Sequence, residues 1–335
     1  MKIFDLKVGY ECNNNCIHCV ITSHKERLQN NAMPTDLTFL EISSVLENAS
    51  RQGVSKVVVT GGEPSIRSDL PQILEHLNGL GMHINVQSNG RRLSNPTLLK
   101  AIESIPGISF TIALHGPTAA LHDQITRKQG SFVETIESIR TLVKLDKRVT
   151  LKIVISKPNA KVLSSIFALA EQEGVSGVCL AFPHGMGNAL TNFREVIPSY
   201  SEIWPELEPI LDRASLSTVS IILETFPPCV IGGRFQNIAE LMDTPQTSVD
   251  YLHVGETVRD WNVDRVSIKT KFSQCEDCLF YAMCEGPWDE YPLIYGNKEF
   301  KPVDFSPSLG EDLLIYMSQI QRMQKALGSP GGQPK

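Results

Sequence analysis

The feature that most constrains the fold is an alternation of two hydrophobic periods from the N-terminus to about residue 182. Short apolar tracts rich in β-branched residues, typical of buried strands, alternate with stretches whose apolar residues recur at helical spacing. The strand-like tracts are Ile3–Val8, Val54–Thr60, His83–Gln87, Ile108–Leu114, Val149–Ile155 and Val175–Phe182. Strands separated by helices predict parallel βαβ units with right-handed crossovers.

Six such units are fewer than the eight of a closed barrel. We therefore predict an α/β fold: a partial (β/α)6 barrel of parallel strands, with a small irregular C-terminal cysteine-rich domain. Functional groups should gather at the carboxyl ends of the strands, whether the sheet is closed or open. One of the predicted helices begins with Ser131-Phe132-Val133-Glu134, which has the pattern of a capping box.

The rhythm of the sequence changes after Phe182. We expect a helix over Ser199–Ala214, which Pro205 and Pro209 should limit or kink, and one more strand over Ser217–Thr225. The chain from Pro227 to about Pro302 reads as irregular. The predicted parts are therefore a core over 1–185, a connecting helix and strand over 186–226, a cysteine-rich domain over 227–310, a C-terminal helix over 311–327 and a flexible tail over 328–335.

Composition narrows the class of protein. Of 335 residues, 41% are hydrophobic and 20% charged, which excludes a wholly disordered chain. The net charge of −6 offers no broad phosphate-binding surface, which disfavours nucleic acid as a partner. No apolar run is long enough to span a membrane, and charges interrupt the N-terminal tract, so we expect a cytoplasmic protein. There the eight cysteines should be thiols, and their spacing indicates metal ligation before disulfides.

Three of the thiols, Cys12, Cys16 and Cys19, follow the first strand tract with the spacing C-x3-C-x2-C. A short loop can wrap three thiolates around one iron–sulfur cube, and the lack of a fourth local ligand would leave one iron open to a non-protein ligand. Thiolate sets of this kind also hold zinc. His18 is a possible fourth ligand, although its position between Ile17 and Cys19 makes convergence on the same ion awkward. A zinc knot or three unligated thiols are the alternatives.

This motif resembles the signature of the radical SAM superfamily, and further segments match that family in the expected order over roughly residues 1–185. Thr60-Gly61-Gly62-Glu63-Pro64, at the end of the second tract, resembles the GGEP motif. Gln87-Ser88-Asn89-Gly90 resembles the [ST]NG turn. Leu114-His115-Gly116, followed by His122-Asp123 and Gly130-Ser131-Phe132, resembles a pattern of members that modify peptides or small molecules.

The resemblance implies that Cys12, Cys16 and Cys19 hold a [4Fe–4S] cluster whose open iron takes the amino nitrogen and carboxylate of S-adenosylmethionine. Reductive cleavage of that cofactor would give a 5′-deoxyadenosyl radical, which abstracts a substrate hydrogen. The glycines would let the backbone approach the methionyl group, and the glutamate would accept a hydrogen bond from its amine. The serine and asparagine would bind the ribose, and an arginine the carboxylate. The cofactor-binding residues implied are Gly61, Gly62, Glu63, Pro64, Ser88, Asn89 and Arg127.

Two positions depart from the family pattern. His18 stands where an aromatic residue often precedes the third cysteine, and Ala113 replaces a small polar residue that commonly contacts the ribose. For His115, His122 and His184 we expect structural or exposed roles rather than catalysis.

A second group of cysteines lies in the C-terminal part. Cys275, Cys278 and Cys284 have the spacing C-x2-C-x5-C, and Cys229 lies upstream. The pattern resembles the auxiliary-cluster extensions called SPASM and Twitch, and four thiols imply one auxiliary [4Fe–4S] cluster in an abbreviated, Twitch-like domain. Zinc is the alternative, and without Cys229 the cluster would keep an open iron. Cys179 lies between apolar neighbours and is expected to be a buried core thiol.

These patterns favour a radical SAM enzyme that abstracts hydrogen from an unactivated C–H bond of a peptide or small metabolite. The second cluster would take part in electron transfer, in an oxidation or a cross-linking reaction, and a flavodoxin or ferredoxin would supply electrons. A redox-neutral epimerase or mutase is one alternative. A non-enzymatic iron–sulfur or zinc module for electron transfer or metal binding is another, which the GGEP element disfavours because a relay needs no amine-binding glutamate. The aromatic residues expected to build a small core near the second group are Phe280, Tyr281, Trp288, Tyr291 and Tyr295.

Overall fold

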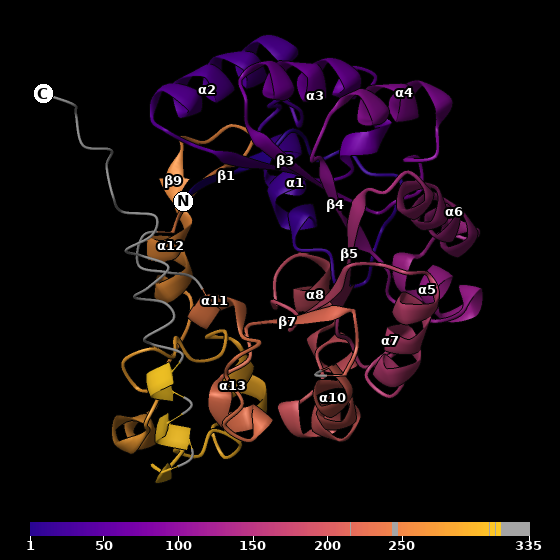
Figure 1. Cartoon of the computed structure of the whole chain (residues 1–335). Helices are drawn as coiled ribbons and strands as arrows, with labels where there is room; N and C mark the ends of the chain where they lie inside the picture. Colours follow the sequence, from indigo (N-terminus) through magenta and orange to yellow (C-terminus); the bar gives the residue numbers. More distant parts are fainter. Residues whose placement is uncertain (215, 243–246, 308, 312, 316–335) are drawn as a thin grey trace, which may run out of the picture.

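The computed structural model describes residues 1–214, 216–242, 247–307, 309–311 and 313–315. Its centre is one nine-stranded sheet in the order β7-β6-β5-β4-β3-β2-β1-β8-β9, which curves without closing (Figure 1). All neighbouring strands are parallel except β8 and β9. The strands are β1 (Lys2–Lys7), β2 (Lys56–Thr60), β3 (His83–Ser88), β4 (Ser109–Ala113), β5 (Arg148–Val154), β6 (Gly177–Ala181), β7 (Ser220–Glu224), β8 (Ser248–Leu252) and β9 (Arg259–Asp260).

The predicted open α/β barrel is confirmed, and the six strand tracts correspond to β1–β6. The strand predicted over Ser217–Thr225 is present as β7. The prediction that the chain from Pro227 to Pro302 is irregular was wrong in one respect, because β8 extends the barrel sheet beside β1. This pairing joins segments more than two hundred residues apart, and no local periodicity reports such a neighbour. Part of the predicted 227–310 domain therefore belongs to the sheet.

Helices cover the outside of the sheet, and α2, α3, α4, α6 and α7 follow one another around it (Figure 1). The helices that accompany β1–β6 are α1 (Ile21–Asn30), α2 (Phe39–Arg51), α3 (Leu70–Gly79), α4 (Pro96–Ser104), α5 (Ala119–Thr126), α6 (Ser131–Lys144) and α7 (Leu163–Gln172). Those that follow are α8 (Asn188–Thr191), α9 (Phe193–Val196), α10 (Tyr200–Ala214), α11 (Ala239–Met242), α12 (Trp261–Ser267) and α13 (Tyr291–Tyr295). Short 3₁₀ helices are η1 (Pro64–Ile66), η2 (Pro228–Ile231) and η3 (Ser273–Asp277).

Helix α6 begins at Ser131, but the predicted capping box was wrong. Gly130 occupies the cap position, and the Ser131 hydroxyl instead lies 2.8 Å from Asp123 Oδ1 and 2.7 Å from Thr126 Oγ1. Asp123 also accepts the backbone N–H groups of Gly130 and Phe132. The free N–H groups at this helix end are thus satisfied by a carboxylate from the preceding helix, a partner that a four-residue motif does not reveal.

Helix α10 runs through both Pro205 and Pro209, so neither ends it. The predicted C-terminal helix over 311–327 falls largely outside the described residues, although 309–311 and 313–315 are helical. The predicted tail over 328–335 lies wholly outside them. Among the described helices, none has the length and apolar character needed to cross a bilayer.

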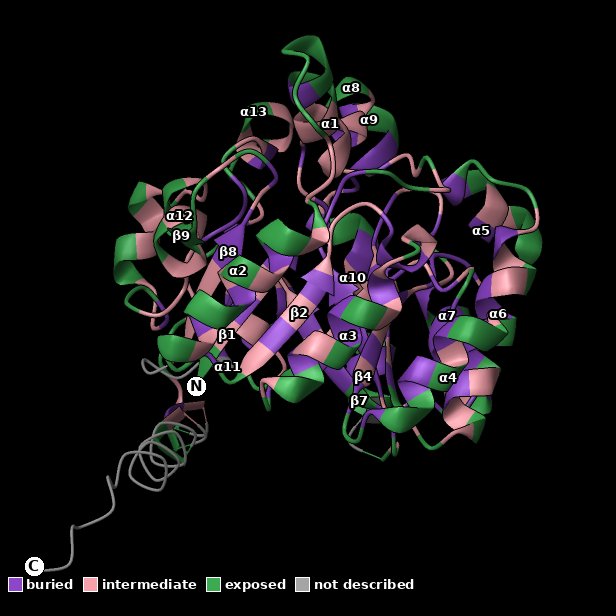
Figure 2. Cartoon of the chain, turned by 90° about the horizontal axis from the view of Figure 1, so that it is seen from above, coloured by how far each residue is buried: buried purple, intermediate pink, exposed green. Residues whose placement is uncertain are grey.

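The two faces of the strands have different surroundings. In β5, Val149, Leu151 and Ile153 are fully buried against the outer helices, whereas Thr150 and Lys152 on the other face are only partly buried. The same alternation of buried and partly buried residues is visible along β2 in Figure 2. Successive side chains of a strand point to opposite faces, so the partly buried residues line the inside of the open barrel. The inner face therefore provides the walls of a cavity.

Candidate functional site

A cavity of about 300 Å³ lies at the carboxyl ends of the strands, and all three thiols of the predicted N-terminal motif line it. We call it the strand-end cavity, and residues 11–19 the N-terminal thiol loop. Residues from the strands β2 to β7 and from the segments that follow them complete the wall. They include Thr60, Gly62, Gln87, Ser88, Asn89, Thr111, Ala113, His115, Lys152, His184 and Glu224. The topology therefore brings the C-x3-C-x2-C and SNG motifs to one place.

The protein's own hydrogen bonds shape the N-terminal thiol loop. The N–H groups of Asn15 and Ile17 each donate over 3.0 Å to carbonyls at the end of α5. Arg91 Nη1 lies 2.6 Å from the Asn13 carbonyl, and Asn89 Nδ2 lies 2.6 Å from Asn13 Oδ1. Arg91 was missed by the sequence analysis. The only signal for it was its place directly after the predicted SNG turn.

The three thiols share a buried environment that disfavours their charged forms. Burial raises the pKa of Cys12 to about 11, and burial also raises the pKa of Cys16 and Cys19. The neighbouring thiols add to the rise at Cys16, which shows that the three groups influence one another. A set of protonated thiols becomes a set of thiolates when a cation balances the charge. Arg127 is exposed, and its charge acts in the opposite direction on the pKa of Cys16.

Gly61 and Gly62 are required by the backbone of the thiol loop. A Cβ atom on Gly61, whose φ is +133°, would lie 2.2 Å from the Gly9 carbonyl oxygen. A Cβ atom on Gly62 would lie 2.3 Å from the Glu11 carbonyl oxygen. The close approach allows backbone hydrogen bonds of 2.8 Å from Gly62 to Gly9 and from Glu63 to Glu11. The glycines therefore dock the turn after β2 onto the start of the thiol loop, and Gly62 lines the cavity as well.

Glu63 is buried and joins two turns. Its carboxylate accepts hydrogen bonds from Ser65 N (2.9 Å), Ser88 Oγ (2.7 Å) and Asn89 N (2.6 Å). Burial raises the pKa of Glu63, and these three donors oppose the rise. Glu63 is thus a positioning residue for Ser88 and Asn89, a role that the sequence did not predict. Pro64 is buried as the first residue of η1 and ends this turn.

Two histidines lie beside the thiol loop. The ligand atoms of Cys16, His18 and His115 lie within 4.8 Å of one another, so His18 converges with one of the three cysteines of the motif. Nδ1 of both histidines is buried, without a hydrogen-bond partner among the described residues. Thiolates around tetrahedral zinc lie about 3.8 Å apart. Cys12 and Cys19 do not belong to that tight group in the described part of the chain.

An ion pair in the cavity wall was also missed. Lys152 Nζ, from β5, lies 2.7 Å from Glu224 Oε2, from β7, and both side chains remain partly exposed to the cavity. Burial raises the pKa of Glu224, but the Lys152 charge outweighs it and holds that pKa below its usual value. Cys179 is buried as expected, and its thiol lies close to the Glu224 carboxylate. The sequence signal for Lys152 was its place at a polar position of a strand in which polar and apolar residues alternate.

The four C-terminal cysteines also meet. Cys229, Cys275, Cys278 and Cys284 line one cavity, and we call this set the auxiliary thiol site. Burial and the charges of the other three thiols raise the pKa of Cys229 to about 12. Backbone N–H groups lie 3.3 to 3.5 Å from the sulfur atoms of Cys284, Cys278 and Cys275. Such donors favour thiolates, so the donor set fits a four-thiolate centre.

The expected aromatic core around this second site is largely present. Phe280, Trp288 and Tyr291 are buried, whereas Tyr281 is 43% exposed. Phe280 also lines the cavity of the auxiliary thiol site, together with Phe272 and Phe300.

An open parallel barrel with three thiols in a loop at its strand ends is typical of one class of proteins. Comparisons with known proteins identify this class. Residues 6–159 match the family model described as "Radical SAM superfamily", and this segment belongs to that superfamily. Two similar curated proteins are an AdoMet-dependent heme synthase of Oleidesulfovibrio alaskensis, 25% identical over 187 residues, and the mycofactocin maturase MftC of Mycobacterium ulcerans, 24% identical over 207 residues. These alignments cover 55% and 61% of this chain and 46% and 50% of the relatives, so the chain spans about half of their length.

Solved structures share the fold over nearly the whole chain. SuiB of Streptococcus suis bound to S-adenosylmethionine has a TM-score of 0.63 at 15% identity, covering 92% of this chain and 76% of SuiB. The anSMEcpe structure with AdoMet and a Cp18Cys peptide has a TM-score of 0.62 at 11% identity, covering 97% and 99%.

Proposed function

We propose that this chain is a radical SAM enzyme that reductively cleaves S-adenosylmethionine at a [4Fe–4S] cluster held by Cys12, Cys16 and Cys19. The 5′-deoxyadenosyl radical would abstract hydrogen from an unactivated C–H bond of a peptide or small metabolite. The observation that carries the proposal is the shared cavity: three thiols of one loop face the same space as Ser88 and Asn89.

The cluster, when bound, supplies the electron that breaks the sulfonium C–S bond. The residues of the chain bind and orient the cofactor. Ser88 and Asn89, fixed by Glu63, are proposed to bind the ribose hydroxyls, and Arg127 the cofactor carboxylate. Gly62 leaves room for the methionyl part at the cavity wall. Because Glu63 already accepts three hydrogen bonds, we assign it to positioning first and to the cofactor amine only through its remaining acceptor site.

The auxiliary thiol site is proposed to hold a second [4Fe–4S] cluster in a SPASM/Twitch-like extension, with Cys229 as the fourth ligand. Its common cavity and its backbone N–H donors support a closed centre. A closed centre transfers electrons without binding substrate, which favours oxidation or cross-linking. A flavodoxin or ferredoxin of the cytoplasm is the proposed electron donor.

The similar proteins support both proposed classes of substrate, a peptide and a small metabolite. SuiB has been solved with its precursor peptide SuiA, and MftC is named a mycofactocin maturase. A heme synthase is also similar over about half of this chain. We therefore propose a peptide or a small metabolite for this cavity.

Anaerobic reconstitution tests the proposal. The wild-type chain should contain iron and sulfide and should form 5′-deoxyadenosine from S-adenosylmethionine under reduction. The triple variant Cys12→Ala, Cys16→Ala, Cys19→Ala should lose this activity. The matched control is Cys179→Ser, which keeps a donor for Glu224 and should remain active. Zinc instead of iron in the wild type, or 5′-deoxyadenosine from the triple variant, would refute the assignment.

The mass of the product separates the reaction types. Candidate precursor peptides and metabolites are incubated with the reconstituted enzyme, and products are compared with substrates by mass spectrometry. Loss of two hydrogens supports oxidation or cross-linking. An unchanged mass supports the redox-neutral epimerase or mutase instead.

A further inference from the structure

One aromatic contact connects the strand-end cavity with the auxiliary thiol site. His184, which follows β6, lines the strand-end cavity. Its ring stacks on Trp288, with centroids 4.2 Å apart and an interplanar angle of 24°. Trp288 is 7% exposed, and its neighbour Pro287 lines the auxiliary cavity together with Cys284. The stack therefore runs from the strand-end cavity to the residue that follows Pro287, in the loop that carries Cys284.

The stack is held on the His184 side. Glu290 Oε2 lies 3.6 Å from His184 Nε2. The other oxygen of Glu290 accepts the backbone N–H of Gly185, which fixes the carboxylate in turn. A histidine positioned by a carboxylate keeps its ring plane, so the stacking distance is maintained.

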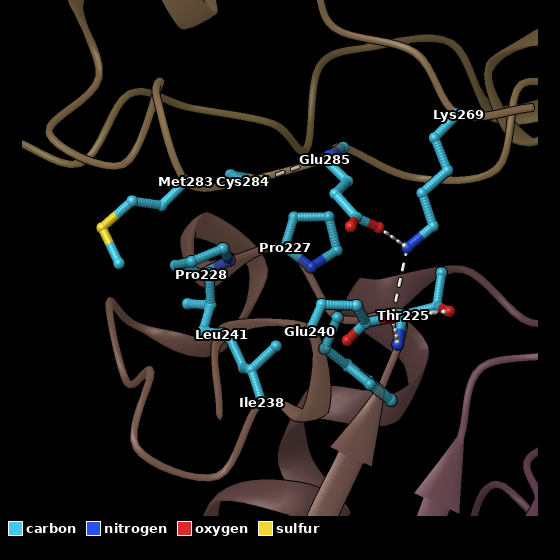
Figure 3. A pocket seen from close by; sticks show the side chains of 12 residues that line it. Thr225, Pro227, Pro228, Ile238, Glu240, Leu241, Lys269, Met283, Cys284 and Glu285 are labelled. Carbon is cyan, nitrogen blue, oxygen red and sulfur yellow. Dashed lines mark hydrogen bonds and ion pairs between the residues drawn. The ribbon is translucent and has the colours of Figure 1, made fainter. Parts of the chain in front are cut away.

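The stack is also held on the Trp288 side. The ammonium group of Lys269 lies 4.9 Å from the centroid of the Trp288 ring. The Lys269 side chain is 1% exposed. Its ammonium group lies 3.1 Å from Glu240 Oε1 and 2.8 Å from Glu285 Oε2. Figure 3 shows both ion pairs, with Cys284 next to Glu285 along the chain. The buried ammonium group of Lys269 is therefore held beside Glu285, the residue that follows Cys284 of the auxiliary thiol site.

The segment that follows His184 also contacts the N-terminal thiol loop. Asn188 N donates over 3.0 Å to the Cys19 carbonyl, and Asn188 Nδ2 donates over 2.8 Å to the Cys16 carbonyl. Gly187 packs so closely that a Cβ atom there would lie 2.3 Å from the Cys19 carbonyl oxygen. The segment that begins at His184 therefore contacts both the N-terminal thiol loop and, through Trp288, the auxiliary side.

We propose that the His184–Trp288 stack is the electron bridge between the strand-end cavity and the auxiliary thiol site. This inference rests on the proposed function, which places a [4Fe–4S] cluster at each thiol set. In turnover, the substrate radical left after hydrogen abstraction loses one electron and one proton. The electron passes through the bridge and reduces the oxidised auxiliary cluster by one unit, the proton leaves to solvent, and the abstracted hydrogen stays in 5′-deoxyadenosine.

The test needs no substrate. The anaerobically loaded chain, without S-adenosylmethionine, is reduced substoichiometrically by methyl viologen radical generated by pulse radiolysis. The redistribution of the electron between the two clusters is followed by absorbance and freeze-quench EPR. Trp288→Leu should lose the fast phase and Trp288→Phe should retain part of it. The midpoint potentials of both clusters should not change, because Trp288 is not a ligand.

The matched control is Trp204→Leu. Trp204, on α10, has a comparable cation contact with Arg234, 5.3 Å from its ring centroid, but belongs to neither end of the stack. It should keep the wild-type rate. If Trp288→Leu does not fold or load, His184→Leu removes the other ring and gives the same loss. A wild-type rate in a bridge variant with both clusters loaded overturns the bridge alone. A wild-type chain that loads one cluster overturns the auxiliary assignment and the bridge with it.

Discussion

The two thiol sets differ in what holds them. The N-terminal thiol loop hydrogen bonds to the end of α5, to Arg91 and to the turn after β2, all parts of a large buried barrel. The auxiliary thiols come from η2, η3 and irregular chain. The barrel should therefore shape the first site without metal. The second region, with few long elements of its own, should depend on the metal that its thiols bind.

The largest effect expected from this contrast follows metal removal. In the chain without clusters, amides of residues 270–303 should lose protection from hydrogen exchange, while those of β1–β6 should keep it. Cys278→Ser should produce the same local loss in the loaded protein. Cys16→Ser is the matched variant, and it should leave the exchange of both regions nearly unchanged. Equal protection of residues 270–303 with and without metal would show that the regions do not differ in this way.

Lys269→Met tests the polar part of the auxiliary region. It removes the cation that Glu240 and Glu285 share, although Glu285 keeps its ion pair with Arg265, and breaking a buried pair costs about 3–5 kcal/mol. Urea unfolding of the loaded protein measures the change. Lys298→Met, at an exposed lysine of the same region, should change the unfolding free energy by less than about 0.5 kcal/mol. If both variants have similarly small effects on the unfolding free energy, Lys269 does not stabilise the auxiliary region.

Glu63→Gln probes the corresponding polar link in the barrel. One carboxylate oxygen becomes an NH₂ group, which then faces an N–H or O–H donor, and a buried mismatch of this kind costs about 1–3 kcal/mol. The variant should also bind S-adenosylmethionine more weakly, since either Ser88 or Asn89 loses its acceptor oxygen. Thermal unfolding and equilibrium dialysis are the measurements. Glu11→Gln, at an exposed side chain of the thiol loop, is the comparison and should be nearly neutral for stability.

The smallest effect is a pH dependence of the barrel. Burial lowers the pKa of His122 to about 4, below its ordinary value of 6.5, so the unfolded chain takes up the proton first. Stability is therefore present above pH 6.5 and falls as the pH decreases toward 4, by at most about 1.4 kcal/mol per pH unit for this group. Urea unfolding at pH 7.5 and 5.5 should show the decrease. His122→Asn, which keeps an acceptor for the His115 N–H, should reduce it. A slope equal to that of the wild type would exclude His122 as its source.

The same contrast explains what the sequence could predict. The strands and helices through Phe182 follow local periodicity, and the motifs at the strand ends converge because parallel strands end at one edge. Residues that act through distant partners were missed: Arg91 on the Asn13 carbonyl, Lys152 with Glu224, and β8 beside β1. Glu63 was recognised by its motif, but its partners lie on another turn. The four auxiliary cysteines were grouped by spacing and resemblance, whereas the stack of His184 on Trp288 depends on tertiary packing alone.

The most direct measurement is EPR of the anaerobically reconstituted, reduced chain, recorded with and without S-adenosylmethionine and combined with iron and sulfide analysis. Two [4Fe–4S] signals should be present, and S-adenosylmethionine should perturb only the one that the Cys12, Cys16 and Cys19 triple variant lacks. A wild-type spectrum that the cofactor leaves unchanged, or iron retained only by the C-terminal cysteines, would contradict the account.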